Sequence, residues 1–242
     1  MTNSGESTLR IGLVLPDVMG TYGDGGNALV LRQRARMRGI DAEIVEITLD
    51  DAVPESLDVY TLGGAEDFAQ RLATRHLTRY PGLQRAAEAG RPVLAICAAI
   101  QVLGHWYETS AGERVEGISM LDATTAPQAT RTIGELVTTP NVEGLTYPLS
   151  GFENHRGGTT LGPAATPFGR VRNGIGNGVG DGNEGAVQGS VIGTYMHGPA
   201  LARNPQLADY LLARALGVEA LAPLDLPEVE QLRKQRLAAA RR

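Results

Sequence analysis

PVLAICAAIQVLG, residues 92–104, is the segment that decides the fold. An apolar run leads directly into Cys97, and two small residues, Ala98 and Ala99, separate this cysteine from a stretch with helical periodicity. A turn of this kind between a strand and a helix holds a nucleophile in a strained backbone conformation at the edge of a sheet. The helix N-terminus favours the thiolate, and the N–H group of Ala98 can stabilise an oxyanion. The segment therefore predicts a nucleophile elbow, with a buried structural cysteine as the alternative.

Apolar runs and helical segments alternate from the N-terminus up to this elbow. Such alternation predicts an α/β fold, in which a mostly parallel sheet is covered by helices on both faces. The expected strands are residues 9–15, 42–47, 57–62 and 92–96. The expected helices are residues 28–38 and 66–80, a short helix after Pro81, one after Cys97, one from Pro205 to Gly217 and one from Pro227.

The second half has short polar or Gly-rich connections between apolar runs. This pattern predicts additional antiparallel strands appended to the parallel sheet. The expected strands are residues 117–121, 132–138, 145–152, 169–172 and 186–196, with a flexible hairpin connection at 174–185. We expect a tail at residues 1–8, one globular domain over 9–217 and a helical extension over 218–242.

Composition excludes several functional classes for this chain of 242 residues. Its net charge of −5 argues against a nucleic-acid-binding protein, and no run of apolar residues is long enough to span a membrane. One cysteine allows no internal disulfide, which indicates a reducing, cytoplasmic location. The sole lysine, Lys234, lies in the last expected helix, so no ATP-binding P-loop is present.

A cysteine nucleophile requires a base, and the sequence offers four histidines. His76 falls on a charged helix that we expect to be exposed, and His105 should lie about 12 Å from Cys97 along the elbow helix. His197 follows an apolar strand, where a base facing the nucleophile belongs. His155, in GFENHRG, remains the second candidate.

Three motifs together resemble the class I glutamine amidotransferases of the CobB/CobQ-like branch, whose fold is a flavodoxin-like three-layer α/β/α sandwich. These motifs are TLGGAEDFAQ (61–70), AICAAIQVLG (95–104) and GTYMHG (193–198). Further motifs narrow the resemblance to the glutaminase subunits of lipid II isoglutaminyl synthases, over residues 9–217. They are LPDVMGTYGDGGN (15–27), RTIGELV (131–137), GFENHRG (151–157) and GTYMHGPALARNPQLADYLL (193–212).

The resemblance implies a role for each motif in the hydrolysis of L-glutamine. Cys97 would attack the side-chain amide, forming a thioester and releasing ammonia, and His197 would act as the base. Backbone N–H groups around Gly64 and at Ala98 would form the oxyanion hole, with Gly63 beside the substrate. The elbow glycines of the family are replaced by alanines here, which is tolerable if neither alanine needs a positive φ.

The resemblance also implies how the substrate and the base are held. Arg131 corresponds to the arginine that binds the α-carboxylate of glutamine, and a surface ion pair is the alternative role for this side chain. Many class I enzymes orient the base with a glutamate two residues after it, but Pro199 stands there in this sequence. A Cys–His dyad is therefore expected, with Asp17, Asp24 or Glu153 as a possible orienting carboxylate.

A partner must use the ammonia. The resemblance implies a heterodimer with a Mur-ligase-like synthetase subunit (MurT), which would bind ATP, Mg²⁺ and lipid II and would amidate D-glutamate to D-isoglutamine. No cofactor or metal is expected in this chain, and the last helix is either a docking element or a solvated charged face. Three other readings remain open: an amidotransferase that serves another synthetase, a stand-alone cysteine hydrolase of γ-glutamyl bonds, and a non-enzymatic scaffold.

Overall fold

The computed structural model describes residues 8–240, so the predicted N-terminal tail lies outside the described residues except for Thr8. The central sheet, sheet A, has the strand order β11-β12-β4-β3-β1-β2. Five neighbouring strands are parallel, and only the edge strand β11 pairs antiparallel, with β12. The strands are β1 (Leu9–Val14), β2 (Ala42–Ile47), β3 (Val59–Leu62), β4 (Val93–Ile96), β11 (Ala186–Gln188) and β12 (Val191–Thr194). The predicted parallel sheet is confirmed.

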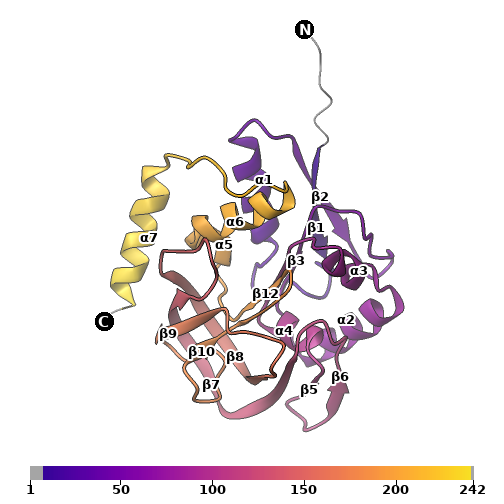
Figure 1. The fold of residues 1–242 in the computed structure, drawn as a ribbon. Coiled ribbons are helices and arrows are strands. Elements are labelled where there is room, and N and C mark those ends of the chain that lie inside the picture. Colours follow the sequence, from indigo (N-terminus) through magenta and orange to yellow (C-terminus); the bar gives the residue numbers. More distant parts are fainter. Residues whose placement is uncertain (1–7, 241–242) are drawn as a thin grey trace.

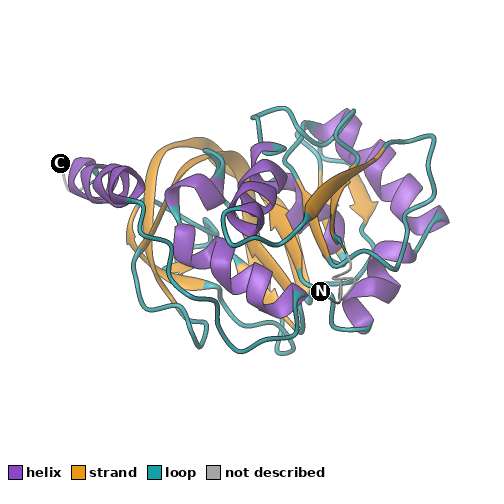
Figure 2. Ribbon diagram, turned by 90° about the horizontal axis from the view of Figure 1, so that it is seen from above, coloured by secondary structure: helices purple, strands orange, loops and turns teal. Residues whose placement is uncertain are grey.

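Two groups of helices cover opposite faces of sheet A (Figures 1 and 2). Helices α1, α5 and α6 contact one another on one face, and α2 contacts α4 on the other. The helices are α1 (Gly26–Arg36), α2 (Asp67–Arg79), α3 (Gly82–Glu88), α4 (Ala98–Leu103), α5 (Ala200–Arg203), α6 (Pro205–Ala215) and α7 (Pro227–Ala239). The last of these, α7, touches α5 and the strand β8 described below, and none of its side chains is buried.

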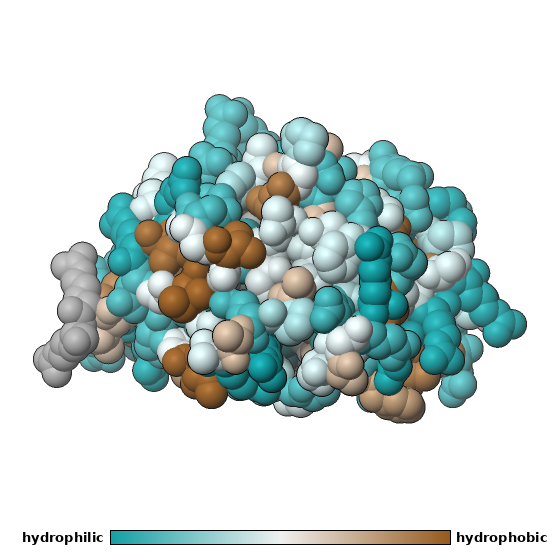
Figure 3. Space-filling model, turned by 90° about the horizontal axis from the view of Figure 1, so that it is seen from below, coloured by the Kyte–Doolittle hydropathy of each residue, from teal (hydrophilic) through white to brown (hydrophobic). Residues whose placement is uncertain are grey.

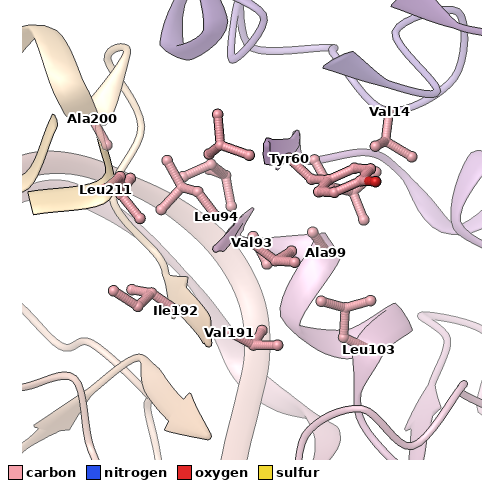
Figure 4. Packing of buried hydrophobic residues seen from close by; sticks show 14 of the residues in the cluster. Val14, Tyr60, Val93, Leu94, Ala99, Leu103, Val191, Ile192, Ala200 and Leu211 are labelled. Atoms are coloured by element: carbon pink, nitrogen blue, oxygen red, sulfur yellow. The ribbon is translucent and has the colours of Figure 1, made fainter. Parts of the chain in front are cut away.

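Alternating strand residues divide the core between the two helix layers. Figure 4 shows Leu94 on the side of Leu211, while its neighbour Val93 lies toward Ala99 and Leu103. This alternation follows from the strand geometry, because successive side chains point to opposite faces of a sheet. The parallel strands therefore read as continuous apolar runs in the sequence.

The antiparallel strands of the second half form a separate sheet, sheet B, rather than an extension of the parallel sheet. Its strand order is β10-β9-β7-β5-β6, and β8 pairs with β7. The strands are β5 (Trp106–Glu108), β6 (Arg114–Glu116), β7 (Ala123–Pro140), β8 (Leu149–Leu161), β9 (Gly169–Asn173) and β10 (Asn183–Glu184). Of the additional strands predicted in the second half, only the run 186–196, which forms β11 and β12, joins sheet A.

Two of the predicted strands were wrong in detail. Residues 117–121 form a loop, because their N–H groups bond to carbonyl groups at the end of α4, including those of Val102 and Leu103. The run 186–196 is divided at Gly189, whose φ of 57° allows the tight turn between β11 and β12.

The loop 174–185 is pinned in place and is not the flexible connection that we predicted. The buried Glu153 carboxylate accepts the N–H groups of Ile175 and Gly176, at 2.8 and 2.9 Å. Asn177, also buried, bonds through its side chain to both backbone groups of Gly185. These buried polar contacts satisfy the loop backbone and attach it to β8.

Candidate active site

The predicted site residues converge at the carboxyl ends of four neighbouring strands of sheet A. Asp24 lies in the loop after β1, Gly64 is the second residue after β3, Cys97 directly follows β4, and His197 is the third residue after β12. Open α/β sheets bind their ligands at this edge. Residues that are up to 173 positions apart therefore share one site.

The elbow around Cys97 has the predicted strained geometry. Cys97 has φ 54° and ψ −110° at the start of α4, a conformation that L-residues rarely adopt. Ala98 and Ala99 lie within α4 and are absent from the described non-glycine residues with positive φ. A Cβ atom on Gly193 of β12 would lie 2.7 Å from Cγ1 of Ile100, so helix and strand approach closely. The two alanine methyl groups are therefore accommodated without strain at their own positions.

His197 is the histidine that faces the nucleophile. Its Nδ1 atom lies 3.0 and 3.1 Å from the two carboxylate oxygens of Asp24. Gly64 lies between the three side chains: a Cβ atom there would be 3.0 Å from Cε1 of His197 and 3.4 Å from Cβ of Cys97. The same atom would lie 3.5 Å from Oδ2 of Asp24, so the site leaves room only for glycine.

The electrostatics of His197 favour the protonated ring. Burial lowers the pKa of His197, but the contact with Asp24, the negative charge of Asp24 and the nearby Cys97 outweigh it and raise the pKa to about 10. An imidazole ring oriented by a carboxylate beside a thiol is the arrangement of a cysteine nucleophile and its base.

The other three histidines have different partners. His155, the second candidate, also lines the cavity beside Cys97, but its ring is buried, stacks on Tyr195 at 3.9 Å between centroids, and places Nδ1 2.9 Å from the carbonyl oxygen of Gly157. His105 contacts Ser119 and Asp122 on the surface. We predicted that His76 is exposed, but this side chain is buried against Tyr80. The helix face that carries it packs inward because α2 is amphipathic.

Of the three candidate orienting carboxylates, Asp24 is the one in contact with His197. Asp17 accepts the N–H group of Leu49 in an exposed position, and Glu153 holds the loop 174–185. The buried Asn27 steadies Asp24, because its Nδ2 atom donates to the Asp24 carbonyl oxygen at 3.0 Å. Asp24, His197 and Cys97 lie in the order of a Cys–His–Asp triad, and the role of Asp24 as the orienting carboxylate stays a prediction.

The N–H group of Gly64 is engaged by the carboxylate. It donates to Oδ2 of Asp24 at 2.9 Å. Within residues 8–240, the N–H groups of Ala65 and Ala98 have no acceptor, and both residues line the cavity beside Cys97. The sequence predicted an oxyanion-hole donor at or near Gly64. Because the N–H group of Gly64 is bonded to Asp24, the available donor in the described chain is that of the next residue, Ala65. Gly63 packs against the chain after β1, where a Cβ atom would meet the carbonyl oxygen of Met19 at 2.4 Å.

A cavity of about 430 Å³ opens in front of Cys97. Arg131 of β7 and Arg156 of β8 line it on one side, and Glu66 and Glu108 supply negative charge. A zwitterionic ligand such as a free amino acid fits such a mixture of charges. Arg131 itself bonds to Asn154 and Tyr22, at 2.7 and 2.9 Å.

A profile of the CobB/CobQ-like glutamine amidotransferase domain matches residues 10–205. The chain belongs to this family. The amidotransferase is 38% identical over 203 residues to a Staphylococcus aureus protein named lipid II isoglutaminyl synthase (glutamine-hydrolyzing) subunit GatD, covering 83% of this chain and 82% of that protein. The subunit of the same name from Streptococcus pneumoniae is 34% identical over 233 residues, or 95% of this chain and 89% of that protein. A cobyric acid synthase from Sphingopyxis alaskensis is 35% identical over 130 residues, which cover 52% of this chain and 24% of that protein.

Solved structures confirm the fold class of the amidotransferase. A glutamine amidotransferase from Thermotoga maritima superposes with a TM-score of 0.50 at 15% identity, covering 97% of this chain and 93% of that one. The glutaminase domain of Trypanosoma brucei CTPS, with bound acivicin, superposes with a TM-score of 0.54 at 10% identity, covering 89% and 97%. These likenesses concern the fold alone, and the roles of the site residues stay predictions.

The predicted residues divide into those that share the site of this amidotransferase and those that do not. Gathered around the cavity or the Asp24 carboxylate are Cys97, His197, Asp24, Gly63, Gly64, Ala98 and Arg131. Asp17 and Glu153 lie elsewhere. Sequence reasoning missed Ala65 and Tyr22, although the motifs TLGGA and TYGD contain both. Among residues 8–240 there is no group of three or more His, Cys, Asp and Glu side chains able to hold a metal ion.

Proposed function

We propose that this chain is the glutaminase subunit of a lipid II isoglutaminyl synthase. The observation that carries the proposal is the contact of His197 with Asp24, next to a strained Cys97, at the base of a cavity with Arg131 on its wall. The names of the two relatives that cover most of the chain supply the substrate class. The reaction in this subunit is hydrolysis of L-glutamine to L-glutamate and ammonia.

The thiolate of Cys97 attacks the side-chain amide carbon of glutamine. The carbonyl π electrons move to oxygen, and the N–H groups of Ala98 and Ala65 receive the resulting oxyanion. The oxyanion collapses, the C–N bond breaks, and His197 donates its proton to the departing nitrogen, which leaves as ammonia. Water, deprotonated by His197, then attacks the thioester, and glutamate and the thiolate are regenerated. Asp24 keeps Nδ1 of the ring protonated and oriented throughout.

The acceptor half of the reaction belongs to a second polypeptide in this proposal. Amidation of a carboxylate requires ATP, and this chain lacks a P-loop lysine. A Mur-ligase-like subunit would bind ATP, Mg²⁺ and lipid II in a heterodimer and convert D-glutamate of the stem peptide to D-isoglutamine. The word subunit in the names of both GatD relatives supports such a partner.

Exposed apolar side chains beside the cavity suit contact with that partner. Phe68 and Ile133 are 69% and 63% exposed, and they lie next to Asp67 and close to Arg131, which line the cavity. Figure 3 shows apolar side chains gathered in patches on one otherwise polar face. Exposed patches of this kind often mark protein interfaces.

The proposal includes a cytoplasmic location, since a reducing compartment keeps the thiol of Cys97 free. No helix among residues 8–240 has the length and apolar character to cross a membrane.

The test is a glutamine-dependent amidation assay with the chain, its partner, ATP, Mg²⁺ and lipid II. We expect ammonia release from glutamine and amidated lipid II, and loss of both with Cys97→Ala. Ammonium chloride should restore amidation in the Cys97→Ala complex, because the partner then receives ammonia directly. Ammonia release that survives Cys97→Ala would refute the nucleophile. Glutaminase activity without amidation of lipid II would favour another synthetase, and activity without any partner on other γ-glutamyl bonds would favour a stand-alone hydrolase.

A further inference from the structure

Tyr22 joins three parts of the site that come from distant segments of the chain. It lies in the loop after β1, two residues before Asp24, and lines the cavity. Its hydroxyl group donates to Oε1 of Glu66 at 2.8 Å and accepts from Nη2 of Arg131 at 2.9 Å. Its ring lies 4.9 Å from the ring of His197, centroid to centroid. One side chain thus contacts both the arginine and the catalytic base of the proposed mechanism.

The hydrogen bonds of Arg131 fix one edge of its guanidinium group. Nε donates to Oδ1 of Asn154 at 2.7 Å, and Nη2 donates to the hydroxyl oxygen of Tyr22. A guanidinium group has five N–H donors, and within the described chain no acceptor is hydrogen-bonded to Nη1 or to the second N–H of Nη2. Nη2 also lies 3.7 Å from Oε1 of Glu66, an ion pair longer than a hydrogen bond. These remaining donors form the edge that binds a carboxylate through two parallel hydrogen bonds.

The side chain of Arg131 needs such support because it is 43% exposed. A long, exposed arginine loses rotamer entropy when it binds a ligand, and contacts that order it beforehand reduce that loss. The hydroxyl group of Tyr22 remains neutral and available as an acceptor, since burial and the neighbouring Glu66 raise the pKa of Tyr22.

We propose that Tyr22 is a positioning residue that orients Arg131 to receive the α-carboxylate of glutamine while its ring supports His197. The inference rests on the proposed function, in which glutamine is the substrate and Arg131 binds it. The two halves of the side chain have separable tasks. The hydroxyl group acts on substrate binding through Arg131, and the ring acts on catalysis through His197.

Two substitutions separate these tasks in the complete enzyme complex with its partner. Tyr22→Phe removes the hydroxyl group and keeps the ring, so we expect the KM for glutamine to rise about 3- to 10-fold with little change in kcat. Tyr22→Ala removes both, so kcat should fall as well. Tyr147→Phe is the matched control, because Tyr147 is 55% exposed and makes no hydrogen bond through its hydroxyl group in the described chain.

A double-mutant cycle shows whether Tyr22 acts through Arg131. In an Arg131→Ala background, Tyr22→Phe should have no further effect on KM, because the group that it positions is gone. With L-glutamine α-amide, which lacks the carboxylate, Tyr22→Phe should likewise change kcat/KM less than 2-fold. A tyrosine that merely stabilises the fold would affect both substrates equally, and thermal unfolding of each variant monitors the fold.

Three results would overturn the inference, and they differ from failure of the proposed function. An unchanged KM in Tyr22→Phe, alongside a raised KM in Arg131→Ala, refutes positioning by Tyr22 and leaves the function intact. Equal effects on glutamine and its α-amide refute the role of the carboxylate. An unchanged KM in Arg131→Ala shows that Arg131 does not bind glutamine, so Tyr22 has no substrate-binding group to position. Absence of glutaminase activity in the unmodified complex refutes the proposed function itself, and the inference with it.

Discussion

At the scale of single residues, the sequence selected one candidate nucleophile and favoured one histidine as its base, but it left three candidates for the carboxylate. Cys97 is the single cysteine, and its elbow can be read from adjacent residues. Asp24 lies 173 positions from His197, so only the fold could show their contact. Its rivals Asp17 and Glu153 have the same chemistry, and each of them bonds to a loop instead. A local sequence pattern can indicate that a carboxylate is needed, whereas only the packing of distant segments shows which carboxylate contacts the histidine.

Asp24→Asn tests whether the carboxylate contributes its charge. Asparagine can still accept the N–H group of Gly64, but the loss of negative charge should lower the pKa of His197. We expect kcat for glutamine hydrolysis to fall on the order of 10²-fold or more, measured by ammonia release, with the His197 titration followed by NMR. Asp17→Asn is the matched control and should retain full activity. Equal activity in Asp24→Asn and Asp17→Asn would show that the charge of Asp24 is not needed and that Cys97 and His197 act as a dyad.

Glu184 makes stability depend on pH in an unusual direction. Burial raises the pKa of Glu184 to about 7, although hydrogen bonds from Thr194 and Tyr195 oppose the change. The folded state therefore holds an extra proton between about pH 4.5 and 7, and stability falls as the pH rises through this window. Glu184→Gln keeps the acceptor oxygen and cannot ionise. We expect it to stabilise the protein by about 1–3 kcal/mol at pH 8 and to have little effect at pH 4.5.

Urea unfolding at both pH values measures this difference. Glu43→Gln, on the exposed side of β2, is the control and should change stability little at either pH. A gain for Glu184→Gln that is the same at pH 4.5 and pH 8 would rule out ionisation as its cause.

At the scale of elements, the parallel strands were predictable and the short antiparallel ones were not. Apolar runs identified β1, β3 and β4 because these inner strands are largely buried on both faces, and the edge strand β2 kept enough apolar residues to be recognised. The strands β5 and β6 have three residues each, too few to show a period. The expected strand at 117–121 became a loop because carbonyl groups at the end of α4 required donors.

The contact between α1 and the loop after His197 gives a test at this scale. A Cβ atom on Gly26 would lie 2.3 Å from Cγ of Pro199, so Gly26→Ala should push these segments apart. We expect a loss of about 1–3 kcal/mol in stability and a lower kcat, because the segments carry Asp24 and His197. Gly134→Ala is the control, since no atom lies within 4 Å of its Cβ position. If Gly26→Ala and Gly134→Ala have the same melting temperature and the same rate of ammonia release, the contact between Gly26 and Pro199 accommodates a methyl group at little cost.

At the scale of the whole molecule, the sequence predicted the α/β fold but not the division into two sheets. The sheets meet at His197, whose N–H group donates to the Phe152 carbonyl oxygen at 2.8 Å and whose carbonyl oxygen accepts from Phe152 at 3.1 Å. His197 is therefore held from sheet B as well as from β12. This arrangement depends on pairing between distant segments, which no local pattern encodes.

The boundary predicted at Gly217 can be tested by truncation. Residues 218–240 contribute the packing of Leu221 on the core, the contact of Ala222 with Arg38, and α7, which touches α5 and β8 but has no buried side chain. A chain that ends at Gly217 should therefore fold, with a loss of at most about 2 kcal/mol in unfolding free energy. An electrophilic glutamine analogue should still label Cys97 as it does in the full chain. A truncated chain that fails to fold would make α7 part of the domain.

The single thiol also allows the protein to be labelled at one defined position. Because the sequence contains one cysteine, a maleimide dye can attach to each chain only at Cys97. The stoichiometry of labelling then counts chains with a reactive thiol, and its rate reports how accessible that thiol is. Glutamine analogues, partner proteins and inhibitors can be ranked by how they protect that thiol, with no engineered residue in the chain.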